Sequence, residues 1–266
     1  RPRVHHGRPA AEVGRVGTIA IAGGTGTVGR HVVAEVERRG HTPIVLSRGN
    51  GVDLTAGSTV LAALAGADVV IDVLSISTFS AAKSVQFFDA TTSLLLSAES
   101  ALGIEHHVAL SIVGIDRAPV DYYAGKVEQE RLIEAGDVPW SILRASQFHE
   151  FAEQMLERAK IGPVRTAPKF RMQPIAASTV AQALVDIAEA APVGRAGDLV
   201  GPREEWLPDL VHAVARARGI GGWIPAIALP GAFGRAMRDG SLLPTEGATL
   251  AGPTFAQWLA EGSSAV

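Results

Sequence analysis

The stretch that most constrains the fold is residues 16–29, which reads VGTIAIAGGTGTVG. Its short apolar run, residues 18–22, predicts a buried strand, and the helical pattern of residues 30–39 follows the glycines directly. This order suits phosphate binding, because unpaired N–H groups and the positive end of the helix dipole point at the anion. We therefore predict a dinucleotide site here. The alternative is an ordinary strand-to-helix turn, since the chain holds 29 glycines.

The glycines of this turn have the spacing G-x-x-G-x-x-G. Gly23 would allow the tight turn, Gly26 would let the backbone approach a pyrophosphate, and Gly29 would let the helix pack closely on the strand. The residues of the turn that we predict to bind the dinucleotide are Gly23, Gly24, Thr25, Gly26, Thr27, Val28 and Gly29.

Composition excludes several classes of protein. The chain of 266 residues has no cysteine, so disulfides, thiolate metal sites and cysteine nucleophiles are absent. A net charge of −3 with mixed signs gives no footprint for nucleic acid or membrane, and no apolar run approaches the length of about 20 residues that spans a bilayer. We expect a soluble, cytoplasmic protein. Residues 1–15 lack an apolar core and are interpreted as a disordered extension or a cloning remnant rather than a signal peptide.

The residue after the second predicted strand, 43–47, bears on the choice of dinucleotide. An acidic side chain about 20 residues past the glycines suits the ribose of NAD, whereas an arginine suits the 2′-phosphate of NADP. Arg48 stands 19 residues after Gly29, with Ser47 before it and no acid nearby. This favours NADP over NAD. The alternative is a surface arginine in a turn.

Further apolar runs, at residues 68–74, 106–112 and within 140–148, the last with the turn that follows it, alternate with helical patterns and predict a parallel α/β sheet. A short strand is also expected at residues 51–54. Ligands sit at the carboxyl ends of strands in such sheets. The strand-end residues that we predict to line the dinucleotide are Asp53, Leu54, Leu74, Ser75 and Ile76.

A Y-x-x-x-K pattern lies in the predicted helix at residues 121–135. Tyr122 and Lys126 are four residues apart, hence on one helical face. A nearby ammonium would stabilise the phenolate and ease proton donation to a forming alkoxide, and the same lysine could hold the nicotinamide ribose. Ser111, at the end of the strand at 106–112, would hydrogen-bond the carbonyl being reduced. These three residues are the predicted catalytic group.

Two histidine motifs are interpreted as structural. His106 and His107 are neighbours on a strand, so they point to opposite faces, and no acidic cluster joins them; we expect no metal site. His149 and Glu150 could form an acid/base pair, but a capping or salt-bridging role at a helix start is the simpler interpretation. A serine hydrolase is set aside because the chain has no G-x-S-x-G elbow.

Together these motifs give the chain a family likeness. Residues 16–160 resemble the short-chain dehydrogenase/reductase superfamily, and more closely its atypical, NmrA-like NAD(P)H-binding branch. The matching segments are GGTGTVG (23–29), LSR (46–48), DVVIDVLS (68–75), HHVALSIVG (106–114), YYAGK (122–126) and PWSILRASQFHEF (139–151). The resemblance implies a Rossmann domain, bound NADP and, in active members, a triad falling on Ser111, Tyr122 and Lys126. It also implies that a segment closing over the nicotinamide contains Ala145, Ser146, Gln147 and Phe148.

We expect a Rossmann-type, doubly wound sheet over residues 16–160 and a smaller substrate-covering lobe, partly rejoining the sheet, over 161–266. The lobe has few charges suited to a sugar nucleotide, which favours a small apolar carbonyl or quinone acceptor. The predicted function is an NADP-dependent reductase, monomeric or homodimeric. One alternative is an NADPH/NADP sensor without turnover. Another is an epimerase or dehydratase acting on a nucleotide sugar.

Overall fold

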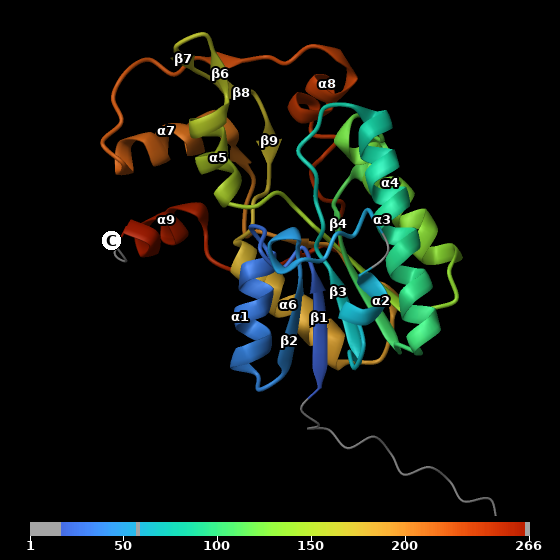
Figure 1. Cartoon of the computed structure of the whole chain (residues 1–266). Coiled ribbons are helices and arrows are strands. Elements are labelled where there is room, and N and C mark those ends of the chain that lie inside the picture. The colour runs from blue at the N-terminus through green and yellow to red at the C-terminus, as the bar shows by residue number, and fades with distance from the viewer. Residues whose placement is uncertain (1–16, 57–58, 264–266) are drawn as a thin grey trace, which may run out of the picture.

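A parallel sheet forms the centre of the molecule in the computed structural model, which describes residues 17–56 and 59–263 (Figure 1). Its strands are β1 (Thr18–Ala22), β2 (Thr42–Leu46), β3 (Val69–Asp72), β4 (His106–Ile112), β5 (Trp140–Ala145), β10 (Gly194–Arg195), β11 (Leu199–Val200) and β14 (Thr249–Leu250). They lie in the order β14-β11-β5-β4-β3-β1-β2, with β10 also paired to β5. The pairings within this sheet are parallel.

Helices cover both faces of the sheet. On one face lie α1 (Gly29–Arg38) and α6 (Ala177–Glu189), and on the other lie α2 (Val60–Ala63), α3 (Ala81–Leu102) and α4 (Tyr122–Ala135) (Figure 1). Val32 and Val36 of α1 pack with Leu184 of α6, whereas Val60 and Leu95 pack on the other side. Because both faces are buried, the strands are apolar runs without alternation. The predicted Rossmann-type α/β fold is confirmed.

The chain after residue 149 divides between the sheet and a separate lobe. The lobe contains α5 (Glu150–Arg158), β6 (Lys160–Ile161), β7 (Val164–Arg165), β8 (Ala167–Pro168), β9 (Arg171–Met172), β12 (Glu205–Trp206), α7 (Leu207–Ala217), β13 (Ala226–Ile227) and α8 (Gly231–Asp239). Figure 1 shows these elements beyond one end of the strands of the sheet, and α9 (Phe255–Ser263) beside them. An apolar cluster with Phe170, Leu207 and Val211 forms the core of the lobe.

Two predicted elements differ in the structure. Residues 51–54 form no strand, because Gly51 takes a left-handed conformation (φ 77°) and the Asp53 carboxylate accepts hydrogen bonds from the N–H and hydroxyl of Thr55. The sequence from Pro202 also predicts a helix, but α7 begins only at Leu207, because Glu205 and Trp206 pair with β9. Both differences come from local or tertiary hydrogen bonds that compete with the apolar pattern.

One helix start also differs from prediction. Ser178 and Thr179, as small polar residues before an apolar helical pattern, predict a cap for α6, but its N-cap is Ala176 and no side chain caps it. The interpretation of residues 1–15 lies outside the described residues. In the described part of the chain, no helix is long and apolar enough to cross a membrane.

The strand order reverses at β1. The chain passes from β1 to β2 on one side, and then crosses to β3 on the other side of β1. In open α/β sheets, ligands bind outside the carboxyl ends of the strands at the point where the order reverses. Here that point is the glycine turn after β1.

Candidate functional site

Backbone hydrogen bonds fix the conformation of the glycine turn. Gly23 has φ 85° and donates its N–H to the Leu46 carbonyl of β2 at 3.1 Å, while the Gly26 N–H bonds to the Gly23 carbonyl at 2.9 Å. A Cβ on Gly29 would collide with the Gly23 carbonyl oxygen and lie 2.6 Å from the Gly24 Cα. Helix α1 therefore begins in direct contact with the turn, and only glycine fits at position 29.

The same turn presents unpaired donors. Within the described residues, the backbone N–H groups of Thr25, Thr27 and Val28 have no hydrogen-bond acceptor. Thr25 and Gly26 are exposed, and the first turn of α1 holds no acidic residue. A row of free N–H groups at a helix start, beside two exposed residues, fits a pyrophosphate.

At the end of β2, a cation lies next to an unpaired hydroxyl. Arg48 is exposed, and no hydrogen bond or ion pair among the described residues holds its guanidinium. The Ser47 hydroxyl is buried without a partner. The pKa of Asp53 is lowered, first by hydrogen bonds from Thr55 and to a smaller extent by the charge of Arg48. Both Ser47 and Arg48 are thus available to a phosphate.

The segment after β3 borders the glycine turn. A Cβ on Gly23 would lie 3.2 Å from the Leu74 nitrogen, so the two segments are in contact. Leu74 donates its N–H to the Asp72 carboxylate at 2.9 Å, which fixes its position. Ser75 is exposed and Ile76 is half-buried. Leu74, Ser75 and Ile76 therefore lie at the same end of the strands as the glycine turn. Leu54 instead packs in the apolar core.

Lys126 of α4 is buried among internal acceptors. It is 2% exposed, and its Nζ donates to the Leu110 carbonyl of β4 at 2.6 Å and to the Gln129 side-chain oxygen. The Nζ also lies 4.8 Å from the ring centroid of Phe88, and the ring of Tyr122 lies 5.9 Å from the same ring. Tyr122 and Lys126 thus meet a common neighbour on α3.

The prediction that the Lys126 ammonium stabilises the phenolate of Tyr122 is wrong. Burial raises the pKa of Tyr122 above its ordinary value, and Tyr123 and the charge of Asp72 raise it further. Burial also lowers the pKa of Lys126 to about 8. Tyr122 is therefore a protonated phenol at neutral pH, suited to donating a proton but not stabilised as a phenolate.

Ser111 lies near the end of β4. The side chain is 2% exposed and lies near the Glu130 carboxylate, but its hydroxyl makes no well-formed hydrogen bond. Glu130 instead accepts from Arg144 at 2.8 and 2.6 Å. No hydrogen bond joins Ser111 to Tyr122 in the described residues. The Ser111 hydroxyl is thus buried beside Glu130, with no hydrogen-bond partner among the described residues.

The segment after β5 combines structural and unpaired groups. Ala145 is buried, and the Ser146 hydroxyl donates to the Gln173 carbonyl at 2.5 Å. Phe148 forms a bridge with Ile175. Gln147 donates its side-chain N–H to the Tyr123 hydroxyl at 3.1 Å, and its side-chain oxygen is buried without a partner. Gln147 is the residue of this segment with a free acceptor.

The histidines are part of the core. His107 lies 2.9 Å from the Glu99 carboxylate of α3, and His106 lies 2.8 Å from the Ser141 hydroxyl. His149 bonds to the Pro253 carbonyl and packs against Phe255 and Trp258. In the described residues, no group of three metal-ligating side chains occurs. These contacts support structural roles.

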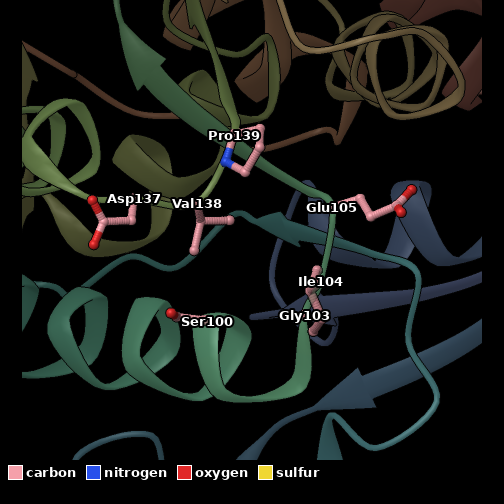
Figure 2. A pocket seen from close by; sticks show the side chains of 7 residues that line it. All are labelled: Ser100, Gly103, Ile104, Glu105, Asp137, Val138 and Pro139. Carbon is pink, nitrogen blue, oxygen red and sulfur yellow. The ribbon is translucent and has the colours of Figure 1, made fainter.

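A hollow of about 440 Å³ lies at the opposite end of the strands from the glycine turn, and Figure 2 shows the residues that line it. It is lined by Ser100, Gly103, Ile104, Glu105, Asp137, Val138 and Pro139. Glu105 precedes β4 and Pro139 precedes β5, so the hollow lies at the amino ends of these strands. None of its lining residues belongs to the predicted site.

Residues 23–191 match the family model described as NAD(P)H-binding. The chain belongs to this NAD(P)H-binding family. The match begins at the first glycine of the turn and includes all the predicted site residues, from Gly23 to Phe148. No curated protein sequence matches the chain closely enough to count as a relative.

Solved structures with the same fold support this assignment. MoeE5 in complex with UDP-glucose and NAD has a TM-score of 0.70 at 17% identity, covering 93% of this chain and 98% of that one. UDP-glucose 4-epimerase from Thermus thermophilus, in complex with NAD, has a TM-score of 0.62 at 18% identity, covering 92% of this chain and 93% of that one. A short-chain dehydrogenase/reductase superfamily protein from Agrobacterium tumefaciens, with bound NAD, has a TM-score of 0.64 at 18% identity, covering 93% of this chain and 96% of that one. The predicted NAD(P)H-binding family is confirmed, and the chain shares its fold with solved short-chain dehydrogenase/reductase and epimerase structures.

Two buried polar residues were missed from the sequence. Asp72 and Gln129 connect β3 to Lys126 through hydrogen bonds. The available signal was an acid within the apolar run 68–74, and a glutamine three residues after Lys126 on the same helix.

Proposed function

We propose that this protein binds NADPH at the glycine turn and transfers a hydride to a small, mainly apolar carbonyl or quinone-like acceptor. The observation that carries the proposal is the set of unpaired N–H groups at Thr25, Thr27 and Val28, which lie at the start of α1 where the residues Thr25 and Gly26 are exposed. The family supports a nicotinamide dinucleotide as the ligand. Arg48 and Ser47 support the 2′-phosphate form, because a guanidinium pairs well with phosphate.

The hydride chemistry is supplied by the dinucleotide when it is bound. Tyr122 would give its proton to the acceptor oxygen as the carbonyl carbon receives the hydride, because its raised pKa keeps it protonated. The unpaired Ser111 hydroxyl would donate a hydrogen bond to the same oxygen. Lys126 would hold the nicotinamide ribose.

The surroundings of Tyr122 support an apolar acceptor. The rings of Phe88 and Tyr123 lie 5.9 and 6.1 Å from that of Tyr122, and Phe233 of α8 lies 5.2 Å from Tyr123. An acceptor that reaches Tyr122 would meet these packed rings, which favour a flat or apolar molecule over a sugar nucleotide.

Arg48→Ala tests the choice of dinucleotide. We expect NADPH affinity to fall about 10- to 100-fold, since hydrogen bonds to a charged group contribute roughly 1.5–3 kcal/mol, while NADH affinity stays unchanged. Fluorescence titration with both dinucleotides measures this, and Arg216→Ala, at an exposed position on α7, is the control. An unchanged ratio of the two affinities would remove Arg48 from the proposal.

A second candidate function is an NADPH/NADP sensor without turnover. The observation in its favour is that internal acceptors already hold Lys126 and that the pKa of Tyr122 is not lowered. A panel of aldehydes, ketones and quinones, assayed by NADPH absorbance, separates the two functions. NADPH binding without oxidation on any acceptor supports the sensor.

A further inference from the structure

A buried chain of hydrogen bonds links β3 to the lysine of α4. Asp72 is fully buried, and its carboxylate accepts from the Gln129 side-chain N–H at 2.8 Å. The Gln129 side-chain oxygen accepts from Lys126, which also donates to the Leu110 carbonyl at 2.6 Å. The side-chain amide of Gln129 thus bridges the Lys126 ammonium and the Asp72 carboxylate.

The same carboxylate also holds the border of the dinucleotide site. Its second oxygen accepts from the Leu74 N–H at 2.9 Å, and Leu74 contacts the glycine turn at Gly23. Asp72 is therefore bonded both to the segment that borders the phosphate turn and, through Gln129, to Lys126. One buried group connects two parts of the proposed site.

Stability alone does not account for this arrangement. Removing a carboxylate and an ammonium from water is costly, and well-packed apolar side chains of similar size are often as stable as a buried ion pair. The neighbouring part of the same layer is apolar, with Ala109, Ile133 and Ile142 packed together. The polar chain thus replaces apolar packing at the point nearest the site.

We propose that Asp72 and Gln129 are positioning residues, which hold Lys126 in place and keep it charged so that it can bind the ribose of the dinucleotide. This inference rests on the proposed function. Gln129 sets where the ammonium lies, and Asp72 supplies the negative charge that favours its protonated form.

The electrostatic surroundings of Lys126 support the role of Asp72. Burial lowers the pKa of Lys126 to about 8, and the charges that oppose this fall are Asp72 first and Glu130 second. The other titratable or charged groups on the elements packed around it are His107 of β4, Glu99 of α3, Arg144 of β5 and Tyr122 of α4. Without Asp72, the pKa of Lys126 would fall further, and the lysine would lose its proton closer to neutral pH.

The proposal predicts a shift in the pH dependence of NADPH binding. In the wild type, affinity should fall as pH rises past about 8. Asp72→Asn should move the midpoint of this fall down by about one pH unit or more, because a nearby opposite charge shifts a pKa by roughly that much. Asp72→Glu should restore the midpoint toward that of the wild type, and Lys126→Met should remove the fall.

Fluorescence titration between about pH 6 and pH 10, with NADPH and with NADH, measures the midpoint. NADH lacks the 2′-phosphate, whose own pKa lies near 6, so it shows how much of any shift comes from that phosphate. Circular dichroism checks the fold of each variant. Thr91→Val is the matched control, since it removes a buried hydroxyl that bonds only to its own helix. Gln129→Met tests the link without removing a charge, and its midpoint should also fall, because Lys126 loses an acceptor.

The outcomes separate two failures. A wild-type protein that does not bind NADPH at any pH overturns the proposed function. A wild-type protein that binds, together with folded Asp72→Asn or Gln129→Met variants whose midpoints equal that of the wild type, overturns the positioning role alone.

Discussion

Gly29→Ala is expected to abolish measurable NADPH binding, with a loss of at least 100-fold. The added Cβ would collide with the Gly23 carbonyl oxygen and lie 2.6 Å from the Gly24 Cα, and both are backbone atoms that cannot turn aside. The glycine turn must therefore move away from α1. The free N–H groups of Thr27 and Val28 then no longer converge on one anion.

Calorimetric titration with NADPH measures this loss, and thermal unfolding measures the accompanying overpacking cost, about 1–3 kcal/mol. Gly197→Ala is the matched control, because a Cβ there meets nothing within 4 Å and the backbone needs no left-handed conformation. We expect that control to bind NADPH as the wild type does. A Gly29→Ala protein that binds normally would contradict the site.

Gly26→Ala separates binding from folding. A Cβ at this exposed position meets only the Gly23 carbonyl oxygen, at 3.2 Å, so we expect the fold to survive with little change in melting temperature. The methyl group would stand where the dinucleotide approaches the backbone, so affinity should still fall. A variant that keeps full affinity would place the pyrophosphate elsewhere.

Sequence patterns predicted the elements whose structure is determined locally. The strand, glycine turn and helix from Thr18 to Arg38 were predicted within a residue, because an apolar run, a row of glycines and a helical period all lie in one short segment. The prediction of a strand at residues 51–54 was wrong, because a side chain there decides the local structure. There the Asp53 side chain bonds to Thr55, and a β-strand pattern carries no sign of this competing turn.

The site was predictable only in part, for a similar reason. The positions of Gly29 and Arg48 follow from spacing along two adjacent elements. The link from Asp72 to Lys126 joins β3 to α4 across 54 positions of sequence, and it exists only because β3 lies beside β4 in the sheet. Helical spacing placed Tyr122 and Lys126 together, but it could not show that burial controls the pKa of both.

Tyr122→Phe is expected to lower turnover by about 100-fold or more while leaving NADPH affinity unchanged, in line with the loss of a positioned proton donor. The substitution is structurally mild. Phenylalanine keeps the ring contacts with Phe88 and Tyr123, and the hydroxyl that it removes makes no hydrogen bond in the described residues. The loss would therefore report chemistry rather than folding.

Single-turnover oxidation of NADPH, on the best acceptor found in the panel, measures the effect. Tyr123→Phe is the matched control, because it removes a hydroxyl from the next residue of the same helix, one that accepts a hydrogen bond from Gln147. We expect turnover of that variant to fall less than tenfold, since the Tyr123 hydroxyl supports Gln147 rather than the acceptor. If Tyr122→Phe turns over as fast as the wild type, Tyr122 is not the proton donor. The Ser111 hydroxyl, unpaired at the end of β4, would then be the next donor to test.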